Sequence, residues 1–178
     1  MKILVLADIN DIHWKEGNGQ ADLLLSCGDV AEQAILEAAA SFGCSRIFAV
    51  KGNHDSSEKF PSRIVDLHLH VEEFRGLRLG GINGAWRYKT KGHFLYDQWE
   101  VDRFLSSFPR VDVFISHNSP RGIHDQADGV HYGFDGLKSY AEGMKPRLLI
   151  HGHQHLNCET QFGETRIVGV CGYRLMEI

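Results

Sequence analysis

The sequence has no long hydrophobic run, no excess of basic residues and few prolines. Its 178 residues include only four prolines, and the formal net charge is −4. No apolar run approaches the roughly 20 residues that a membrane-spanning helix needs. The opening MKILVLADIND breaks at Asp8, too early for the apolar part of a secretory signal. We therefore expect a soluble cytoplasmic protein without a membrane partner.

Two other classes of protein are disfavoured by composition. The four cysteines (Cys27, Cys44, Cys158 and Cys171) show no CxxC spacing, so we expect reduced thiols and neither disulfides, a zinc knuckle nor a catalytic thiol. A net negative charge gives no basic footprint for nucleic acid, which makes long duplexes unlikely partners.

Short apolar runs alternate with segments of helical spacing. Buried-type strands are expected at 2–7, 21–27, 46–50, 111–116 and 147–150, and helices at 32–42, near 96–108 and near 135–144. Alternating stretches at 66–74 and 77–82 flank the Arg75-Gly76 turn, and the tail predicts antiparallel strands joined at Gly163 and Gly172. This pattern predicts one α/β domain over 1–178, with two mixed β-sheets packed as a sandwich and helices outside.

Each predicted buried strand is followed by polar residues of the kind that bind metals. The residues are Asp8 and Asn10, Asp29, Asn53 with His54 and Asp55, His117, and finally His151 and His153. Any one of them has an ordinary explanation as a turn residue or a hydrogen-bonded histidine. If the strands share a direction, however, their carboxyl ends bring all five groups into one crevice. We therefore predict a polar cluster that bound cations would satisfy.

Those motifs, in that order, resemble the calcineurin-like metallophosphoesterase family. The family pattern is D-x-H, GD, GNH(D/E), a lone H, and GHxH or HGH, and the match runs from Asp8 to His153. The GD, GNHD and HGH elements are intact. The departure is in the first motif, where Asn10 takes the usual histidine position.

The resemblance implies a centre of two divalent metal ions. Mn²⁺ is favoured, with Fe, Zn, Mg or Ni as alternatives. One ion would bind Asp8, Asn10, Asp29 and His153, and the other Asp29, Asn53, His117 and His151. His13 is the alternative to Asn10 for completing the first site, although it lies further from the strand end.

The resemblance also implies a hydrolytic mechanism. A metal-activated hydroxide would attack the phosphorus in line, without a covalent enzyme intermediate. His54 would protonate the leaving oxygen as general acid, and Asp55 would orient its imidazole.

The substrate is indicated only loosely. A small phosphate mono- or diester is expected, and the segment from Asp112 to Gly152 slightly favours phosphodiesterase activity on nucleotide-like esters. Arg87 and Arg121 are the candidate phosphate contacts, and the loop residues that could stack on a base or assist are Trp86, Tyr88, His124 and Tyr132. The alternative is a catalytically weak scaffold for partner proteins on the same fold, which Asn10 favours. A nuclease is a third possibility, but no basic groove supports it.

Overall fold

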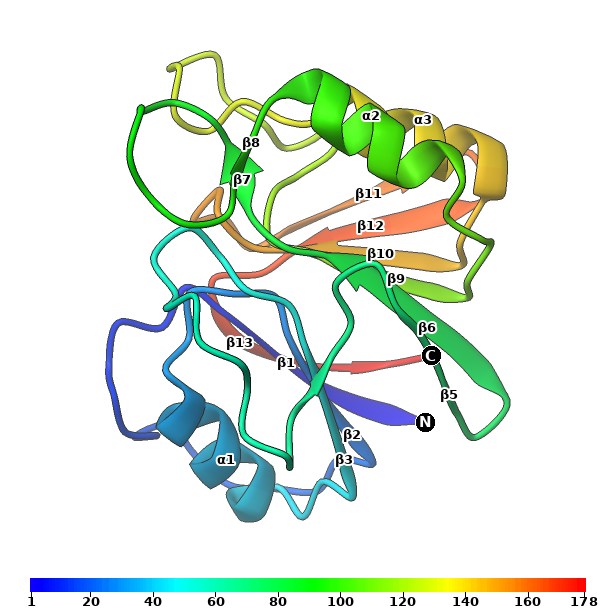
Figure 1. Cartoon of the computed structure of the whole chain (residues 1–178). Helices are drawn as coiled ribbons and strands as arrows, with labels where there is room; N and C mark the ends of the chain where they lie inside the picture. The colour runs from blue at the N-terminus through cyan, green and yellow to red at the C-terminus, as the bar shows by residue number, and fades with distance from the viewer.

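The computed structural model describes all residues, 1–178, in two β-sheets packed face to face with helices on both outer sides (Figure 1). The five-stranded sheet contains β1 (Lys2–Ala7), β2 (Leu23–Ser26), β3 (Arg46–Ala49), β4 (Val65–Asp66) and β13 (Gly172–Glu177). The six-stranded sheet contains β5 (Val71–Phe74), β6 (Leu77–Ile82), β9 (Val113–Ser116), β10 (Leu148–His151), β11 (Cys158–Phe162) and β12 (Thr165–Gly169). A separate pair contains β7 (Ala85–Trp86) and β8 (Leu95–Tyr96), and the helices are α1 (Glu32–Ser41), α2 (Gln98–Ser106) and α3 (Asp135–Met144).

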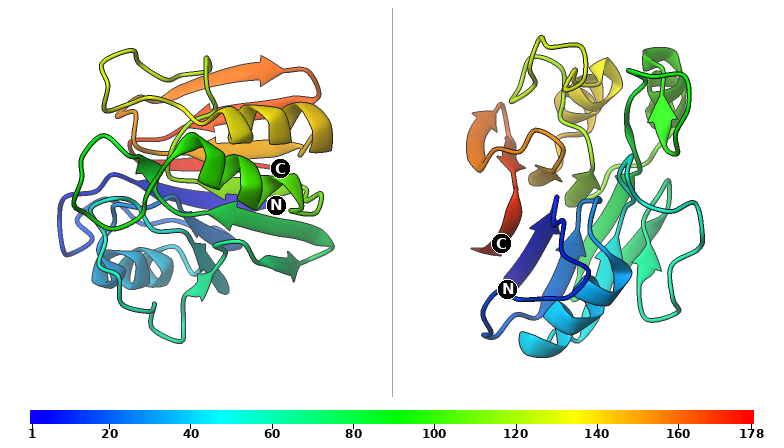
Figure 2. Two further views of the ribbon diagram at one scale, coloured as in Figure 1. Left: turned by 45° about the horizontal axis from the view of Figure 1, so that its top comes forward. Right: turned by 90° about the vertical axis from the view of Figure 1, so that its left-hand side faces the viewer.

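Both sheets are parallel at their centres and antiparallel at an edge. The first has the order β13-β1-β2-β3-β4, with β1 to β4 parallel and β13 antiparallel to β1. The second has the order β11-β12-β10-β9-β6-β5, with antiparallel pairs only at β11–β12 and β5–β6. Both chain ends lie close together beside β1 and β13, where the Met1 ammonium donates to the Ile178 carbonyl at 3.0 Å (Figure 2). The mixed two-sheet fold expected from the sequence is confirmed.

Alternating side chains of the central strands build three apolar layers. In β1, Ile3 and Val5 face the other sheet, whereas Leu4 and Leu6 face α1. Both faces are fully buried, which explains why such strands read as continuous apolar runs. The six-stranded sheet packs its outer face on α2 and α3, where Phe114 is among the buried residues. Figure 1 shows α1 below one sheet and α2 and α3 above the other.

α2 begins at a hydrogen-bonded cap that the sequence encodes. Asp97 and Glu100 form a capping box, in which Glu100 Oε2 accepts the backbone N–H of Asp97 at 2.8 Å. Val101 and Leu105, four residues apart, bury the same face. No helix of the structure has the length and apolar character needed to cross a membrane.

Two expected connections differ in the structure. The stretch 66–74 is divided between β4 and β5, which belong to different sheets, and only 71–74 forms the hairpin with β6. The hairpin turn lies at Arg75 and Gly76, both with positive φ, as a two-residue turn of the primed kind requires. In the tail, Gly163 does join an antiparallel pair, but the chain crosses to the other sheet before Gly172, and β13 pairs with β1. Alternation of residues indicates a strand and not which partner it finds.

Candidate metal centre

Polar side chains from both sheets meet at the carboxyl ends of the parallel strands. Two hydrogen bonds join loops of one sheet to loops of the other. His117 Nδ1 donates to the Cys27 carbonyl at 2.8 Å, and the His153 backbone N–H donates to Asp8 Oδ2 at 2.8 Å. The loops after β1, β2, β9 and β10 therefore form one cluster, as expected where parallel strands end together.

Three acceptor-type atoms converge at the centre of this cluster. His117 Nε2 lies 3.3 Å from Asp29 Oδ2 and 3.2 Å from Asn53 Oδ1. Because the Cys27 carbonyl takes the Nδ1 proton, the Nε2 nitrogen is the one presented to the two oxygens. A carboxylate oxygen, an amide oxygen and an imidazole nitrogen can approach one another this closely only when a proton or a cation lies between them.

Asp8 completes the cluster with an unsatisfied oxygen. Ligand atoms of Asp8, Asp29 and His117 all lie within 4.8 Å of one another. Asp8 Oδ2 accepts the His153 N–H, but Asp8 Oδ1 is buried and has no hydrogen-bond partner. A buried, unpartnered carboxylate oxygen is costly. The donor set of carboxylate, amide and imidazole fits a divalent cation such as Mn²⁺ or Zn²⁺.

Two glycines allow the cluster to close. A Cβ on Gly52 would collide with Asp29 Oδ1 and lie 2.7 Å from His117 Cε1, and a Cβ on Gly28 would collide with the Gly52 backbone. Asp8 and Asp29 themselves have φ of +54° and +53°, a left-handed conformation that costs free energy for residues other than glycine. The GD and GN pairs therefore reflect close backbone approach as well as chemistry.

The electrostatics of the cluster are those of a site prepared for positive charge. Burial opposes a charged His117, but the Asp29 and Asp8 carboxylates outweigh it and raise the pKa of His117 to about 9. Burial likewise opposes ionisation of Asp29, but His117 lowers the pKa of that carboxyl to about 2. Burial raises the pKa of Asp8. By contrast, burial and the His117 charge lower the pKa of His153 to about 3, so its imidazole is neutral.

Asp55 does not contact the His54 imidazole, contrary to the role expected of it. Its Oδ2 accepts the backbone N–H groups of Gly52 at 2.7 Å and Asp29 at 2.9 Å, which join the loops after β3 and β2. His54 is exposed, and its backbone N–H donates to Asp29 Oδ1 at 2.8 Å. Asp55 thus holds the ligand loops together, and the His54 ring projects at the open side of the cluster.

His151 lies in a separate hydrogen-bonded chain. His151 Nδ1 donates to the Gly152 carbonyl (3.0 Å), and its Nε2 lies 2.9 Å from His124 Nδ1. His124 Nε2 in turn lies 2.9 Å from Thr160 Oγ1. With Nδ1 protonated, His151 Nε2 accepts the proton of His124 and has no lone pair free for a metal. Burial lowers the pKa of His151 to about 3, consistent with a neutral structural imidazole.

His153 and His155 occupy the positions that His151 and His153 were expected to fill. The His153 ring lies 5.0 Å from the His117 ring, and its Nε2 donates to the Val130 carbonyl at 3.2 Å, which leaves Nδ1 for a ligand. The His155 charge is among the influences that lower the Asp8 pKa. Sequence reasoning missed His155, although the pattern GHxH is also satisfied by residues 152–155.

The candidates on the loop after β1 are less closely engaged. Asn10 is exposed and forms no hydrogen bond within the chain. His13 Nδ1 pairs with Glu37 Oε1 of α1 at 3.0 Å, which turns it away from the cluster. His13 is therefore not the rescue ligand that it was considered to be.

The loop residues proposed for substrate differ in their placement. Arg87 is committed to Asp97 (3.2 Å) and Glu100 (3.1 Å) at the start of α2, so its guanidinium supports a helix cap. Arg121 pairs with Asp125 at 3.2 Å and lies over the Tyr132 ring. The other aromatic candidates lie nearer: Tyr88 accepts a hydrogen bond from Asn53 Nδ2 at 3.1 Å, and Trp86 packs 5.7 Å from Tyr132.

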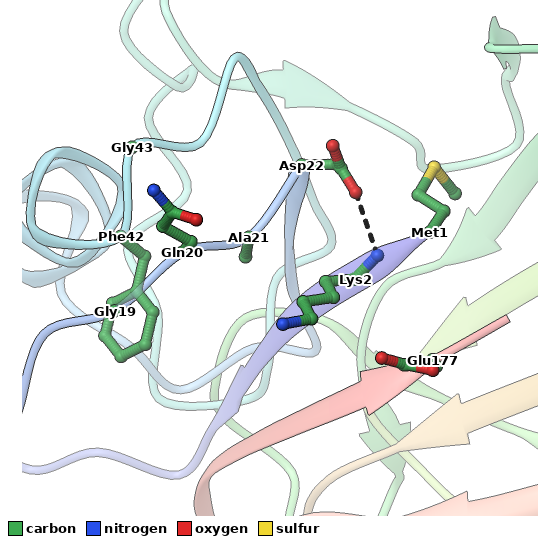
Figure 3. Close-up of a pocket in the computed structure, with 9 residues that line it drawn as sticks. All are labelled: Met1, Lys2, Gly19, Gln20, Ala21, Asp22, Phe42, Gly43 and Glu177. Atoms are coloured by element: carbon green, nitrogen blue, oxygen red, sulfur yellow. Dashed lines mark hydrogen bonds between the residues drawn. The ribbon is translucent and has the colours of Figure 1, made fainter.

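A cavity of about 690 Å³ lies at the opposite end of the first sheet (Figure 3). Its lining includes Lys2 at the start of β1, Asp22 before β2, and Glu177 at the end of β13, with the Asp22 carboxylate accepting the Lys2 N–H at 2.9 Å. These residues mark the amino ends of the parallel strands. None of the candidate ligands lines this cavity, which separates it from the metal centre.

Comparison with known proteins agrees with this geometry. Residues 1–157 match the sequence model described as calcineurin-like phosphoesterase. No curated protein matches the chain. Similar solved structures include phosphopantetheinyl hydrolase from Mycobacterium tuberculosis (13% identity, TM-score 0.60, covering 96% of this chain and 89% of that one). TT1561 of Thermus thermophilus (12%, 0.57, 95% and 89%) and zinc-bound Vps29 from Entamoeba histolytica (13%, 0.55, 100% and 86%) are also similar. At these identities the structural likeness concerns the fold.

Proposed function

The chain belongs to the calcineurin-like phosphoesterase family, and from that premise we propose that it hydrolyses small phosphate esters at a centre of two divalent metal ions. The observation that carries the proposal is the convergence of Asp29 Oδ2, Asn53 Oδ1 and His117 Nε2 beside the unpartnered Asp8 Oδ1. These atoms are satisfied together by bound cations and not by one another.

Two ligand sets follow from the contacts. Asp29 lies between Asp8 and His117 and is the bridging carboxylate. The second ion would take Asn53, His117 and His153 Nδ1 with Asp29, and the first would take Asp8 and His155. Asn10 remains a candidate ligand of the first ion through its amide oxygen. His151 is replaced in this proposal because both of its ring nitrogens have partners.

The expected chemistry is hydrolysis without a covalent intermediate. Divalent ions at such a centre lower the pKa of water and neutralise charge on a phosphoryl group, with Mn²⁺ favoured among the candidates. The chain's own contribution is to hold the ligands through Asp55 and the cross-sheet hydrogen bonds. His54 is the general acid that protonates the leaving oxygen, since its ring is exposed beside Asp29.

The substrate proposed is a phosphodiester or monoester with a nucleotide-like group. Trp86 and Tyr132 offer an aromatic surface, and Tyr88 reaches Asn53 at the cluster. Arg121, stacked on Tyr132, is the better placed of the two arginines for a phosphate. Similarity to a phosphopantetheinyl hydrolase supports the same class of substrate.

A scaffold on the same fold is the second candidate function. It is favoured by exposed Tyr173 and Leu175 on the edge strand β13, with Trp14 packed 5.4 Å from Tyr173, and by the likeness to Vps29. The buried, unsatisfied ligand cluster argues against a silent site.

A hydrolysis screen distinguishes the two candidates. Metal-stripped protein is reconstituted with Mn²⁺, Zn²⁺ or Mg²⁺ and tested with bis-p-nitrophenyl phosphate, p-nitrophenyl phosphate and cyclic nucleotides. We expect metal-dependent turnover that Asp29→Asn abolishes. Metal binding without turnover of any ester would favour the scaffold.

A further inference from the structure

A histidine outside the predicted motifs lies beside the ligand cluster. His131 follows a tight turn in which one carboxylate, that of Asp128, holds three groups. Asp128 Oδ1 accepts the backbone N–H groups of Val130 (2.9 Å) and His131 (2.8 Å), and Asp128 Oδ2 pairs with His131 Nδ1 at 2.5 Å. The ring is therefore fixed with Nδ1 occupied, and Nε2 has no partner in the chain.

The orientation of His131 is the one that metal-bound histidines show. A ligating imidazole almost always donates its second ring N–H to a carboxylate or a backbone carbonyl, which fixes the tautomer. Asp128 does this for His131, as the Val130 carbonyl does for His153 and the Cys27 carbonyl for His117. The side chain of His131 is 22% exposed and that of Asp128 is 45% exposed, so the pair lies at the rim of the cluster.

Ring separations place His131 within reach of an ion at the cluster. With metal–nitrogen bonds of about 2.0–2.1 Å, two imidazoles on one ion have ring centroids roughly 4.5–5.3 Å apart. The His131 ring lies 5.1 Å from that of His153 and 5.8 Å from that of His155. The first separation is close to that between His117 and His153 (5.0 Å), and the second exceeds the range slightly.

The cluster lacks an imidazole on the same side. Asp8 and His155 lie there, and the third candidate, Asn10, is exposed without a hydrogen bond and offers only a neutral amide oxygen. An amide is a poorer ligand than imidazole for a borderline transition metal.

We propose that His131, held by Asp128, is a ligand of the metal ion on the Asp8 side and supplies the imidazole that Asn10 does not. This inference rests on the proposed metal centre. It adds a ligand from the loop between β9 and α3, so that the ion is bound from both the strand ends and the loop above them. Asp128 is the positioning residue.

Calorimetric titration of metal-stripped protein with Mn²⁺ and with Zn²⁺ tests the assignment. We expect His131→Ala to weaken one of two binding steps by about 10- to 100-fold and to leave the other unchanged. Asp128→Asn should weaken the same step by a smaller factor. His70→Ala is the matched control, because His70 also pairs with a carboxylate, that of Glu72 (3.1 Å), but lies beside β5. It should leave both steps unchanged.

Two further variants make the test independent of folding and of turnover. His131→Asn keeps a side chain that can hydrogen-bond to Asp128 but has no outward nitrogen, so it should fold and still lose the step. Asn10→His in the His131→Ala background should restore it. Pulsed electron paramagnetic resonance of the Mn²⁺-loaded protein should show one fewer coordinated nitrogen in His131→Asn than in the wild type.

Unchanged affinities and nitrogen couplings in both His131 variants would overturn the assignment. A raised KM with unchanged metal binding would also overturn it and make His131 a substrate contact. Failure of the wild type to hydrolyse any ester would contradict the proposed function instead, since the titrations do not depend on turnover.

Discussion

Asp29 Oδ2 lies 3.3 Å from His117 Nε2, although Asp29 follows β2 of one sheet and His117 follows β9 of the other. The His117 side chain is fully buried and that of Asp29 is 11% exposed, so little water screens the pair. In the metal-free protein, this contact joins the two sheets at the ligand cluster. Its strength therefore decides both how the empty site is held and how readily a cation displaces the proton on His117.

Asp29→Asn should remove metal and activity together. The amide keeps the size of the side chain and can still accept the His54 N–H, but it cannot carry the charge that bridges two cations. We expect the secondary structure to be retained, because Asp29 lies beyond the end of β2 and outside the apolar layers. Elemental analysis with far-ultraviolet circular dichroism checks this. Unchanged metal content in the variant would contradict the two-metal arrangement.

Metal binding should release a proton, with a dependence on pH set by His117. The folded, metal-free pKa of His117 is raised to about 9, whereas a metal ligand must be a neutral imidazole. Binding at pH 7 therefore displaces about one proton from this residue. His153, with a pKa lowered to about 3, is already neutral and contributes none.

The sign of this dependence can be measured. The apparent metal affinity should rise with pH up to about 9 and then level off, and the proton release should fall toward zero above that pH. The stability that the Asp29–His117 pair gives the metal-free protein runs the opposite way: it is fully present below pH 6.5 and is lost as the pH rises through about 9. Calorimetry in buffers of different ionisation enthalpy counts the protons. Pairing of Asp29 with a neutral His117 would instead give no release at pH 7.

Asp55→Ala should destabilise the protein by about 1–3 kcal/mol, because the N–H groups of Gly52 and Asp29 lose their common acceptor. Asp55→Asn keeps one acceptor oxygen and should cost less. Asp66→Ala is a suitable control, since Asp66 is exposed and accepts only the nearby His68 N–H. Urea denaturation of the metal-free proteins measures all three. An Asp55→Ala variant of unchanged stability, with activity lowered only for poor leaving groups, would return Asp55 to the imidazole-orienting role.

The sequence located most of the site because strand ends carry positional information. Asp8, Asp29, Asn53 and His117 each directly follow a buried parallel strand or its glycine, and parallel strands place their carboxyl ends at one edge. The adjacent Gly28 and Gly52 fit the close approach that the structure reveals. These features depend on local order along the chain, which a sequence displays directly.

The remaining assignments depend on which side chain finds which partner. His151 is the last residue of β10 and turns to His124, so the ligand positions move two residues along to His153 and His155. Asp55 was assigned to a neighbouring ring, but its carboxylate accepts backbone N–H groups from two loops. Side-chain pairs between segments distant in sequence have no signal in periodicity or spacing, which explains both differences.

His54→Ala should lower kcat without removing metal. The only hydrogen bond by which His54 supports the cluster comes from its backbone N–H to Asp29 Oδ1, and alanine keeps that donor. Loss of the imidazole removes the proton for the leaving oxygen, so kcat should fall by about 10²- to 10⁴-fold for alkyl esters. For p-nitrophenyl esters, whose leaving group needs little protonation, the loss should be much smaller. His70→Ala serves as the control, with no change in either rate. Steady-state kinetics over a series of leaving groups, together with metal analysis, checks the expectation. An equal loss for all leaving groups would assign His54 to substrate binding, and loss of metal would make it a ligand.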